Sequence, residues 1–148
     1  MRSIVIGAVF TGILGIGLAL AQSDPIKERQ ELMKSNGRSV GTVTAMLKGE
    51  KPFDAKAAAD AMGEINGNIG TFVTLFPEGT ETGGNTRAKP EIWKNKKDFE
   101  DWGAQLKEDT AKAQAAAAGG MDSVRAALAE VGKTCTGCHD DYRAPEKK

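Results

Sequence analysis

The chain has 148 residues, with 20 Lys and Arg residues and 20 Asp and Glu residues, so its formal net charge is zero. This length favours a single domain, since domains commonly hold about 100–200 residues. The balanced charge argues against a basic nucleic-acid-binding stripe and an acidic disordered tract, and the two cysteines are too few and too close to form a disulfide framework.

The first 21 residues, MRSIVIGAVFTGILGIGLALA, have the features of a secretory signal peptide. Arg2 precedes an uncharged apolar run, and residues 19–21 match the small-x-small pattern of a cleavage site. We therefore expect a signal peptide over 1–21 and a mature domain over 22–148, exported to the periplasm and free of the membrane. An uncleaved anchor is the alternative, although the run is glycine-rich and shorter than the ~20 residues of a usual spanning helix.

The segment 23–49 is predicted to form the first of four amphipathic helices. Ser23 or Asp24 can cap its N-terminus, and Pro25 suits its first turn. Alternating steps of four and three residues define a seam that is apolar at its ends and polar, soft or empty at its centre. The seam consists of Ile26, Gln30, Met33, Gly37, Val40, Thr44 and Leu47.

Three more helices are predicted further along the chain. The second covers about 54–76 and stops at Pro77, the third covers 90–118, and the fourth covers 121–142. Each has a seam at helical spacing. The seams are Ala55, Ala58, Met62, Ile65, Ile69, Phe72 and Phe76 on the second helix, Ile92, Phe99, Leu106 and Ala113 on the third, and Met121, Val124, Leu128, Val131, Cys135, Cys138 and Tyr142 on the fourth. Residues 77–89, PEGTETGGNTRAK, form a polar glycine-rich loop between the second and third helices. Four long amphipathic helices of similar length predict an all-α fold, the antiparallel four-helix bundle.

Both cysteines and the single histidine lie in the sequence TCTGCHDDYR near the end of the chain. Cys135, Cys138 and His139 share one helical face, because residues three and four apart are neighbours on a helix. The spacing Cys-x-x-Cys-His is the attachment signal for c-type heme. Two thiols at this spacing can form thioethers to the heme vinyl groups while the imidazole binds the iron. The sequence therefore predicts one covalent heme c, with its iron, per chain.

Three other interpretations of this motif stay open at this point. A zinc site normally needs four ligands, so a carboxylate such as Asp140 would have to join the three Cys and His residues of the chain. A thioredoxin-like dithiol belongs on a βαβ scaffold, for which the sequence has no strand pattern. The third interpretation is a pair of buried structural thiols beside an unrelated histidine.

An exported four-helix bundle with Cys-x-x-Cys-His on its last helix resembles the class II c-type cytochromes, cytochrome c′ and its low-spin relative cytochrome c-556. The matching pieces are RQELMK at 29–34, PEIW at 90–93 and VGKTCTGCHDDYR at 131–143. Class I cytochromes place the heme motif near the N-terminus and a methionine ligand far downstream. Here nine residues follow His139 and none is methionine.

The resemblance implies a role for each matching residue. Cys135 and Cys138 are expected to be the thioether anchors, and His139 the proximal iron ligand. Arg29 and Gln30 match family positions that contact the heme propionates. A guanidinium suits that contact because it offers several fixed donors to a carboxylate.

Met33 matches the position of the distal iron ligand in the low-spin members, and the string LMKSNGR is closer to those members. Gly37, one turn later, leaves room for a flat macrocycle. A thioether ligand raises the heme potential and closes the iron to exogenous ligands. The other interpretation of Met33 is a core filler, a common use of methionine.

Whether Met33 binds the iron decides between two expected functions. With Met33 on the iron, the protein is a one-electron carrier between periplasmic redox proteins. With an open sixth position, it is a five-coordinate heme protein that binds nitric oxide or carbon monoxide. An enzyme such as a peroxidase is disfavoured, because no second histidine exists to move protons. The resemblance leaves a homodimer and a monomer both open.

Overall fold

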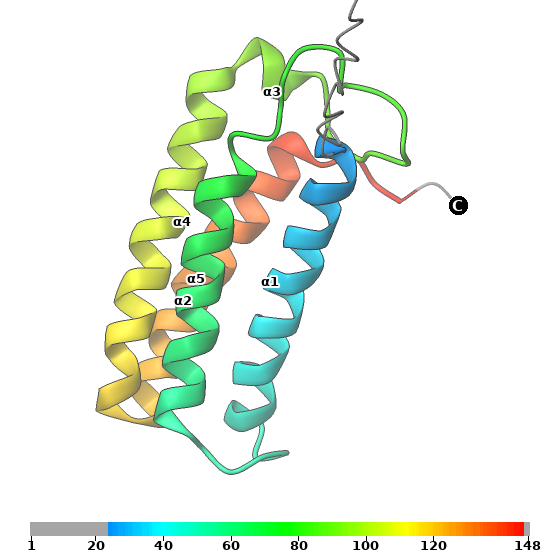
Figure 1. The fold of residues 1–148 in the computed structure, drawn as a ribbon. Helices are drawn as coiled ribbons and strands as arrows, with labels where there is room; N and C mark the ends of the chain where they lie inside the picture. The colour runs from blue at the N-terminus through cyan, green and yellow to red at the C-terminus, as the bar shows by residue number, and fades with distance from the viewer. Residues whose placement is uncertain (1–23, 147–148) are drawn as a thin grey trace, which may run out of the picture.

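The computed structural model describes residues 24–146, and the predicted signal peptide lies outside the described residues. Four long helices form a bundle, joined by the one-turn helix α3 before α4 and the 3₁₀ turn η1 after it (Figure 1). None of the helices formed by residues 24–146 has the length and hydropathy of a membrane-spanning segment. The elements are α1 (Pro25–Leu47), α2 (Ala55–Phe72), α3 (Glu91–Lys94), α4 (Lys96–Ala116), η1 (Ala117–Gly119) and α5 (Met121–Tyr142).

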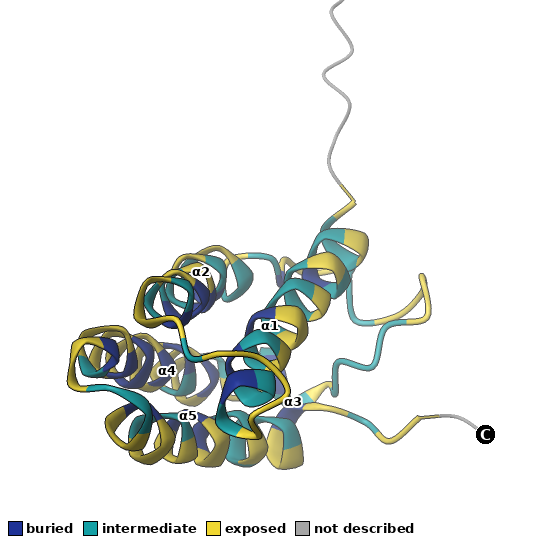
Figure 2. Ribbon diagram, turned by 90° about the horizontal axis from the view of Figure 1, so that it is seen from below, coloured by how far each residue is buried: buried dark blue, intermediate teal, exposed yellow. Residues whose placement is uncertain are grey.

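The long helices pack in chain order, α1 along α2, α2 along α4, and α4 along α5. Over the described residues, α1 and α5 do not pack along each other, and Figure 2 shows α1 inclined to the other three long helices. The two helices are linked at one end, where Arg125 Nη2 donates to the Leu47 carbonyl oxygen at 3.1 Å. The predicted all-α bundle is confirmed, and α1 diverges from α5 toward its N-terminal end.

Side-chain caps fix where the first two long helices begin. The Asp24 carboxylate accepts hydrogen bonds from the backbone N–H groups of Ile26 at 2.9 Å and Lys27 at 3.2 Å. Asp54 caps α2 in the same way, accepting from Ala57 N at 2.9 Å. Each cap satisfies backbone donors that have no partner within the helix, which typically stabilises a helix by ~1 kcal/mol.

Two predicted helix boundaries were wrong. The second long helix ends at Phe72 rather than Phe76, because a residue before proline, as Phe76 is before Pro77, is disfavoured in the helical region. The third predicted helix, 90–118, is interrupted at Asn95, whose φ of −121° and ψ of 48° are not helical. Asparagine has a low helix propensity, so a break there costs little.

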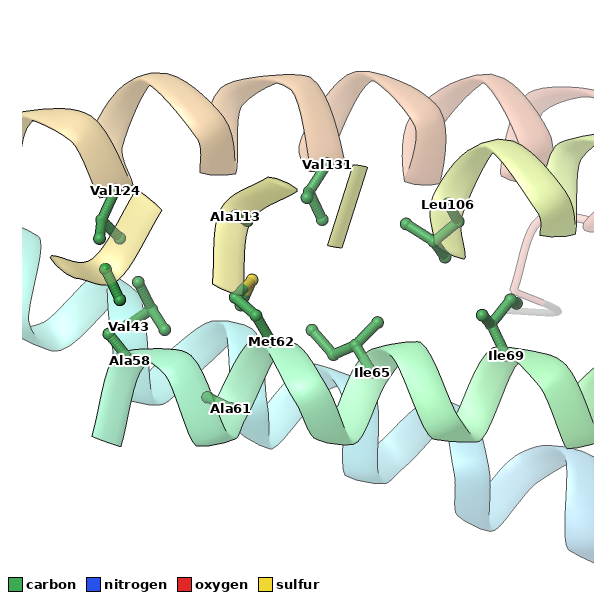
Figure 3. Packing of buried hydrophobic residues seen from close by; sticks show 11 residues of the cluster. Val43, Ala58, Ala61, Met62, Ile65, Ile69, Leu106, Ala113, Val124 and Val131 are labelled. Carbon is green, nitrogen blue, oxygen red and sulfur yellow. The ribbon is translucent and has the colours of Figure 1, made fainter. Parts of the chain in front are cut away.

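The main core cluster lies between the four long helices and is almost entirely aliphatic (Figure 3). Most of the seams predicted for the second, third and fourth long helices are buried in it or in the neighbouring aromatic cluster, which confirms them. The main core cluster consists of Val43, Ala58, Ala61, Met62, Ile65, Ile69, Leu106, Ala113, Ala117, Val124 and Val131.

The most buried face of α1 is shifted by about one residue from the predicted seam, whose members Met33, Val40 and Leu47 are partly buried against the main core cluster. This helix buries Arg29, Ser39, Val43 and Met46, whereas Gly37 at the centre of the predicted seam is exposed. The reason is that α1 packs on α2 along one flank and does not pack along α5 on the other. Its buried positions therefore lie one residue from the predicted seam, and two of them, Arg29 and Ser39, are polar.

Polar side chains join α1 to α2 along that flank. Ser39 Oγ donates to Glu64 at 2.8 Å, and Asn68 Nδ2 donates to the Asn36 side-chain oxygen at 2.9 Å. At about 100° of rotation per residue, Met33 lies on a different flank of α1 from Ser39. Asn36, three residues after Met33, lies on the same side of α1 as Met33, so this side of the helix also borders α2.

A second hydrophobic cluster, the aromatic cluster, lies at the end of the bundle where α1 begins and α5 ends. Its rings meet edge to face, with centroid distances of 4.7 Å for Phe76 and Phe99 and 5.3 Å for Phe99 and Tyr142. This arrangement is favourable for aromatic pairs beyond the area that they bury. The aromatic cluster consists of Phe76, Ile92, Phe99 and Tyr142, with Phe72, Val73, Ala88, Trp93, Trp102 and Cys138 packed against it.

Candidate heme site

Helix α5 carries the whole Cys-x-x-Cys-His motif, and its three side chains are half-buried. Both thiols are free. Cys135 packs against the main core cluster, whereas Cys138 packs against the aromatic cluster. The two thiols therefore lie where the two clusters meet, with His139 beside them.

The surroundings of the motif keep its side chains uncharged. Burial raises the pKa of the Cys138 thiol to about 12, with smaller contributions from Cys135 and Asp141. Burial also raises the pKa of Cys135. The pKa of His139 is lowered, first by burial and then by the positive charges of Arg143 and Arg87. A neutral imidazole is the form whose ring nitrogen can bind a metal.

The end of α5 is fastened to the loop that precedes α3. Backbone hydrogen bonds run from Lys89 N to the Tyr142 oxygen at 3.0 Å and from Ala144 N to the Arg87 oxygen at 2.7 Å. Lys89 Nζ also donates to the Asp140 carbonyl at 2.7 Å. These hydrogen bonds to Arg87 and Lys89 fix the backbone directly after His139, so the imidazole is carried on a helix end that is held in place.

Gly137, inside the motif, is where the indole of Trp102 packs directly on α5. A Cβ atom built at Gly137 would overlap the Trp102 ring, with Cζ3 at 2.9 Å and Cη2 closer still. Trp102 belongs to α4 and packs in the aromatic cluster beside Cys138. The glycine therefore permits the close approach of α4 to the heme-binding motif.

We expect Gly137→Ala to destabilise the fold by ~1–3 kcal/mol, the usual range for overpacking a well-packed site. The matched control is Gly132→Ala on the same helix, where a Cβ would meet no atom within 4 Å. Alanine is favoured over glycine inside a helix by about 1 kcal/mol, so this control should be neutral or stabilising. Denaturant unfolding measures both variants. If Gly137→Ala is as stable as Gly132→Ala, the proposed close contact with Trp102 is wrong.

On α1, Arg29 is a buried cation, and two of its hydrogen-bond donors are unpaired. Its side chain is 4 % exposed, and its guanidinium lies over the Phe76 ring at 4.4 Å from the centroid. Nη2 donates to the Thr80 carbonyl at 2.9 Å, whereas Nε and Nη1 are buried without a partner among the described residues. Burial lowers the pKa of Arg29, and Asp24 and Glu81 oppose that shift. Two buried donors on a cation suit a carboxylate.

Gln30, the second residue predicted to contact a propionate, holds the loop 77–89 in this structure. Its Nε2 donates to the Gly84 carbonyl oxygen at 2.9 Å and holds the loop 77–89 against α1. Gly84 has φ of +52° and lies close to Ile26, so the loop passes tightly over the start of α1. Gln30 and Arg29 together thus position this loop.

Met33 is half-buried one turn beyond Arg29 and packs against the main core cluster, as Cys135 does from α5. A Cβ built at Gly37, one turn further, would meet no atom within 4 Å. Met46 differs, because it is buried and its sulfur accepts a hydrogen bond from Asp54 N at 3.4 Å. Met33 and Cys135 thus pack against the same cluster from α1 and α5, and the Met33 sulfur accepts no hydrogen bond among the described residues.

Arg29 and the motif lie at the same end of the bundle. A continuous set of contacts runs from the Arg29 guanidinium to Phe76, from Phe76 to Phe99, and from Phe99 to Tyr142 on α5. Because α1 and α5 run in opposite directions, moving one turn inward along each helix leads to Met33 on α1 and to Cys138 and His139 on α5.

The residues at this end of the bundle fit a heme group. A heme combines a flat apolar ring with two carboxylates, and the site combines apolar walls with one buried guanidinium. A small pocket against Cys138 is lined by apolar side chains from α2 and α4, including Phe72 and Leu106. The unpaired nitrogens of Arg29 offer donors for a carboxylate. Within residues 24–146, no three His, Cys, Asp or Glu side chains are grouped to hold a metal ion such as zinc.

Sequence reasoning missed a polar pair behind the motif. Thr134, the residue before Cys135, is buried and its Oγ1 donates to Asp109 Oδ2 on α4 at 2.6 Å. Asp109 lies three residues after Leu106, on the face that the predicted seam of this helix buries. The position of Asp109, a carboxylate on the buried face of its helix, could have indicated this pair from the sequence.

Comparison with known proteins gives concordant matches. Residues 24–143 match the family described as Cytochrome C′. The cytochrome c-556 of Agrobacterium tumefaciens is 38 % identical over 118 residues, which cover 80 % of this chain and 95 % of that protein. The solved cytochrome c′ of Rhodopseudomonas palustris has a TM-score of 0.77 and 34 % identity, covering 85 % of this chain and 100 % of that one. A cytochrome c′ variant from Alcaligenes xylosoxidans with bound nitric oxide has a TM-score of 0.74 and 31 % identity, covering 83 % and 95 %.

Proposed function

The chain belongs to the cytochrome c′ family of class II c-type cytochromes, whose members carry covalent heme c, and on that basis we propose that it is a periplasmic one-electron carrier. In this proposal Cys135 and Cys138 hold the heme through thioethers. His139 is the proximal iron ligand and Met33 the distal one. The observation that carries the proposal is the half-buried Cys-x-x-Cys-His face of α5 at the same end of the bundle as Met33.

The bound heme supplies the one-electron exchange between ferric and ferrous iron. The residues of the chain hold and shield it. Burial favours the neutral form of the His139 imidazole, and the contacts of Lys89 fix the helix end that carries it. The aromatic cluster excludes water next to Cys138. The two unpaired nitrogens of Arg29 are suited to a propionate.

Two observations support Met33 as the distal ligand: its position on α1, and the burial of the other methionines of α1 and α2 in the core. Met33 is half-buried against the main core cluster, and Gly37 on the next turn leaves space beside it. Met46 and Met62 are buried in the bundle core. A thioether on the iron suits electron transfer, because it closes the site to other ligands.

A second candidate function is gas binding by a five-coordinate heme. The nitric oxide-bound cytochrome c′ variant from Alcaligenes xylosoxidans shares the fold, so the same bundle also supports this function in a relative. In this alternative, Met33 packs against the main core cluster without binding iron.

Ultraviolet–visible and resonance Raman spectra of the purified holoprotein separate the two candidates. The carrier proposal predicts a low-spin, six-coordinate heme in both the ferric and the ferrous states at neutral pH. A high-spin, five-coordinate ferrous heme that takes up carbon monoxide or nitric oxide rapidly would reject Met33 as a ligand and support the gas-binding alternative.

Export is part of the same proposal. We propose cleavage of the signal peptide after Ala21, so that the mature domain 22–148 meets its redox partners in the periplasm. N-terminal sequencing of protein recovered from the periplasm should begin at Gln22. Recovery of the heme protein with residues 1–21 in the membrane fraction would instead support the uncleaved anchor.

A further inference from the structure

Asp109 is a buried carboxylate that the proposed heme attachment does not use. It lies on α4, is 7 % exposed, and accepts hydrogen bonds at both oxygens. Thr134 Oγ1 donates to Oδ2 at 2.6 Å, and Gln105 Nε2 donates to Oδ1 at 2.9 Å. Among the described residues, no Lys, Arg or His nitrogen lies within ion-pair distance of this carboxylate. The nearby cation Lys112 pairs with Glu108, which raises the pKa of Lys112, and Asp109 adds to that shift without an ion pair.

A buried negative charge without a cation is costly. Removing an ionised carboxylate from water costs several kcal/mol after relaxation, and two neutral hydrogen-bond donors offset part of that cost. An asparagine at position 109 has nearly the same shape. Its side-chain oxygen can accept from Gln105, and its nitrogen can donate to the hydroxyl oxygen of Thr134. The hydrogen bonds alone therefore do not account for a charged group here.

The carboxylate faces the helix that carries the heme motif. Its partner Thr134 directly precedes Cys135, and the charge of Asp109 adds to the effect of burial in raising the pKa of the Cys135 thiol. Charges interact over longer distances in the protein interior than at the surface, where water and salt screen them. A negative charge at Asp109 therefore acts on any change of charge at the heme site.

We propose that Asp109 is a fixed negative charge that lowers the reduction potential of the heme iron. Ferric heme carries one more positive charge than ferrous heme, so a nearby buried carboxylate stabilises the ferric state. The step is the transfer of one electron from a redox partner to the iron. This inference rests on the proposed heme attachment to Cys135 and Cys138, and it is independent of whether Met33 binds iron.

The test is the midpoint potential of the holoprotein with Asp109→Asn, measured by spectroelectrochemistry at neutral pH. We expect a higher potential than in the wild type. A threefold rise in the ferrous-to-ferric ratio at a fixed applied potential is the expected scale, equivalent to about 28 mV at 59 mV per tenfold change. A variant with the wild-type potential overturns the inference.

The matched control is Glu108→Gln, which removes one negative charge from the neighbouring residue. Glu108 is exposed and forms an ion pair with Lys112 at 2.7 Å. Salt screens exposed charges, so any shift in this control should vanish at high ionic strength, whereas the Asp109→Asn shift should persist. Equal shifts that both vanish in salt would overturn the proposal.

A second variant covers the case in which Asp109→Asn does not fold. Asp109→Leu combined with Thr134→Val replaces both partners by apolar groups of similar size, a change that can be nearly neutral for stability. It should also raise the potential, and an unchanged potential again overturns the inference. Absence of covalent heme in the wild type would overturn the proposed function as well, whereas intact heme with an unchanged potential overturns the role of Asp109 alone.

Discussion

Replacing both motif cysteines, Cys135→Ser and Cys138→Ser, is expected to abolish covalent heme attachment completely. These are the two cysteines of the chain, so no other thiol can form a thioether. Serine is similar in size to cysteine and keeps the helix, so the change removes the sulfur with little change in shape. After denaturation and acid–acetone extraction, the heme should leave the variant polypeptide and stay on the wild type, as followed by absorbance and by the mass of the protein.

The control for this variant is Thr136→Ala, an exposed change between the two cysteines. It leaves the Cys-x-x-Cys-His spacing intact and should retain the full content of covalent heme. Heme that survives denaturation on the double serine variant would show that the attachment does not run through these thiols.

Met33→Leu is expected to convert a low-spin heme to a high-spin, five-coordinate heme at neutral pH. Leucine conserves the volume and the apolar packing of methionine, so the variant removes the sulfur ligand and little else. The open site should also gain rapid carbon monoxide binding in the ferrous state. Resonance Raman spin-state markers and carbon monoxide titration measure both effects.

Met46→Leu is the matched control for the distal ligand. Its sulfur accepts a hydrogen bond from Asp54 N at 3.4 Å within the same helix pair. The change should lower the free energy of unfolding slightly and leave the spin state unchanged. A low-spin heme in Met33→Leu would show that a group other than Met33 supplies the sixth ligand, and a high-spin heme in the wild type would show that no strong ligand occupies this position.

The buried faces of α2, α4 and α5 followed the sequence closely, because each of these helices packs against apolar neighbours. Ile65, Phe99 and Val131 lie at seam positions and are at most 2 % exposed. The face of α1 could not be predicted in this way. Helix α1 packs along one helix, α2, partly through polar pairs such as Ser39 with Glu64. The spacing of apolar residues cannot predict such polar pairs.

The heme motif could be predicted from the sequence because its three residues lie within five consecutive positions, 135–139. The groups that surround it could not, because they depend on which helix faces α5. Asp109 and Thr134 are 25 residues apart, and Trp102 and Gly137 meet across the same helix pair. Arg29 was predicted to contact propionates from the resemblance alone. Its two unpaired buried nitrogens are a property of the folded chain that the sequence does not reveal.

The most direct test of the account is the intact mass of the wild-type protein, purified from the periplasm of a host with a working cytochrome c maturation system, together with its alkaline pyridine spectrum. The account predicts a coloured protein whose mass equals the chain from Gln22 to Lys148 plus one heme, with the absorption bands of a heme joined by two thioethers. A colourless protein with the mass of the polypeptide alone would contradict it.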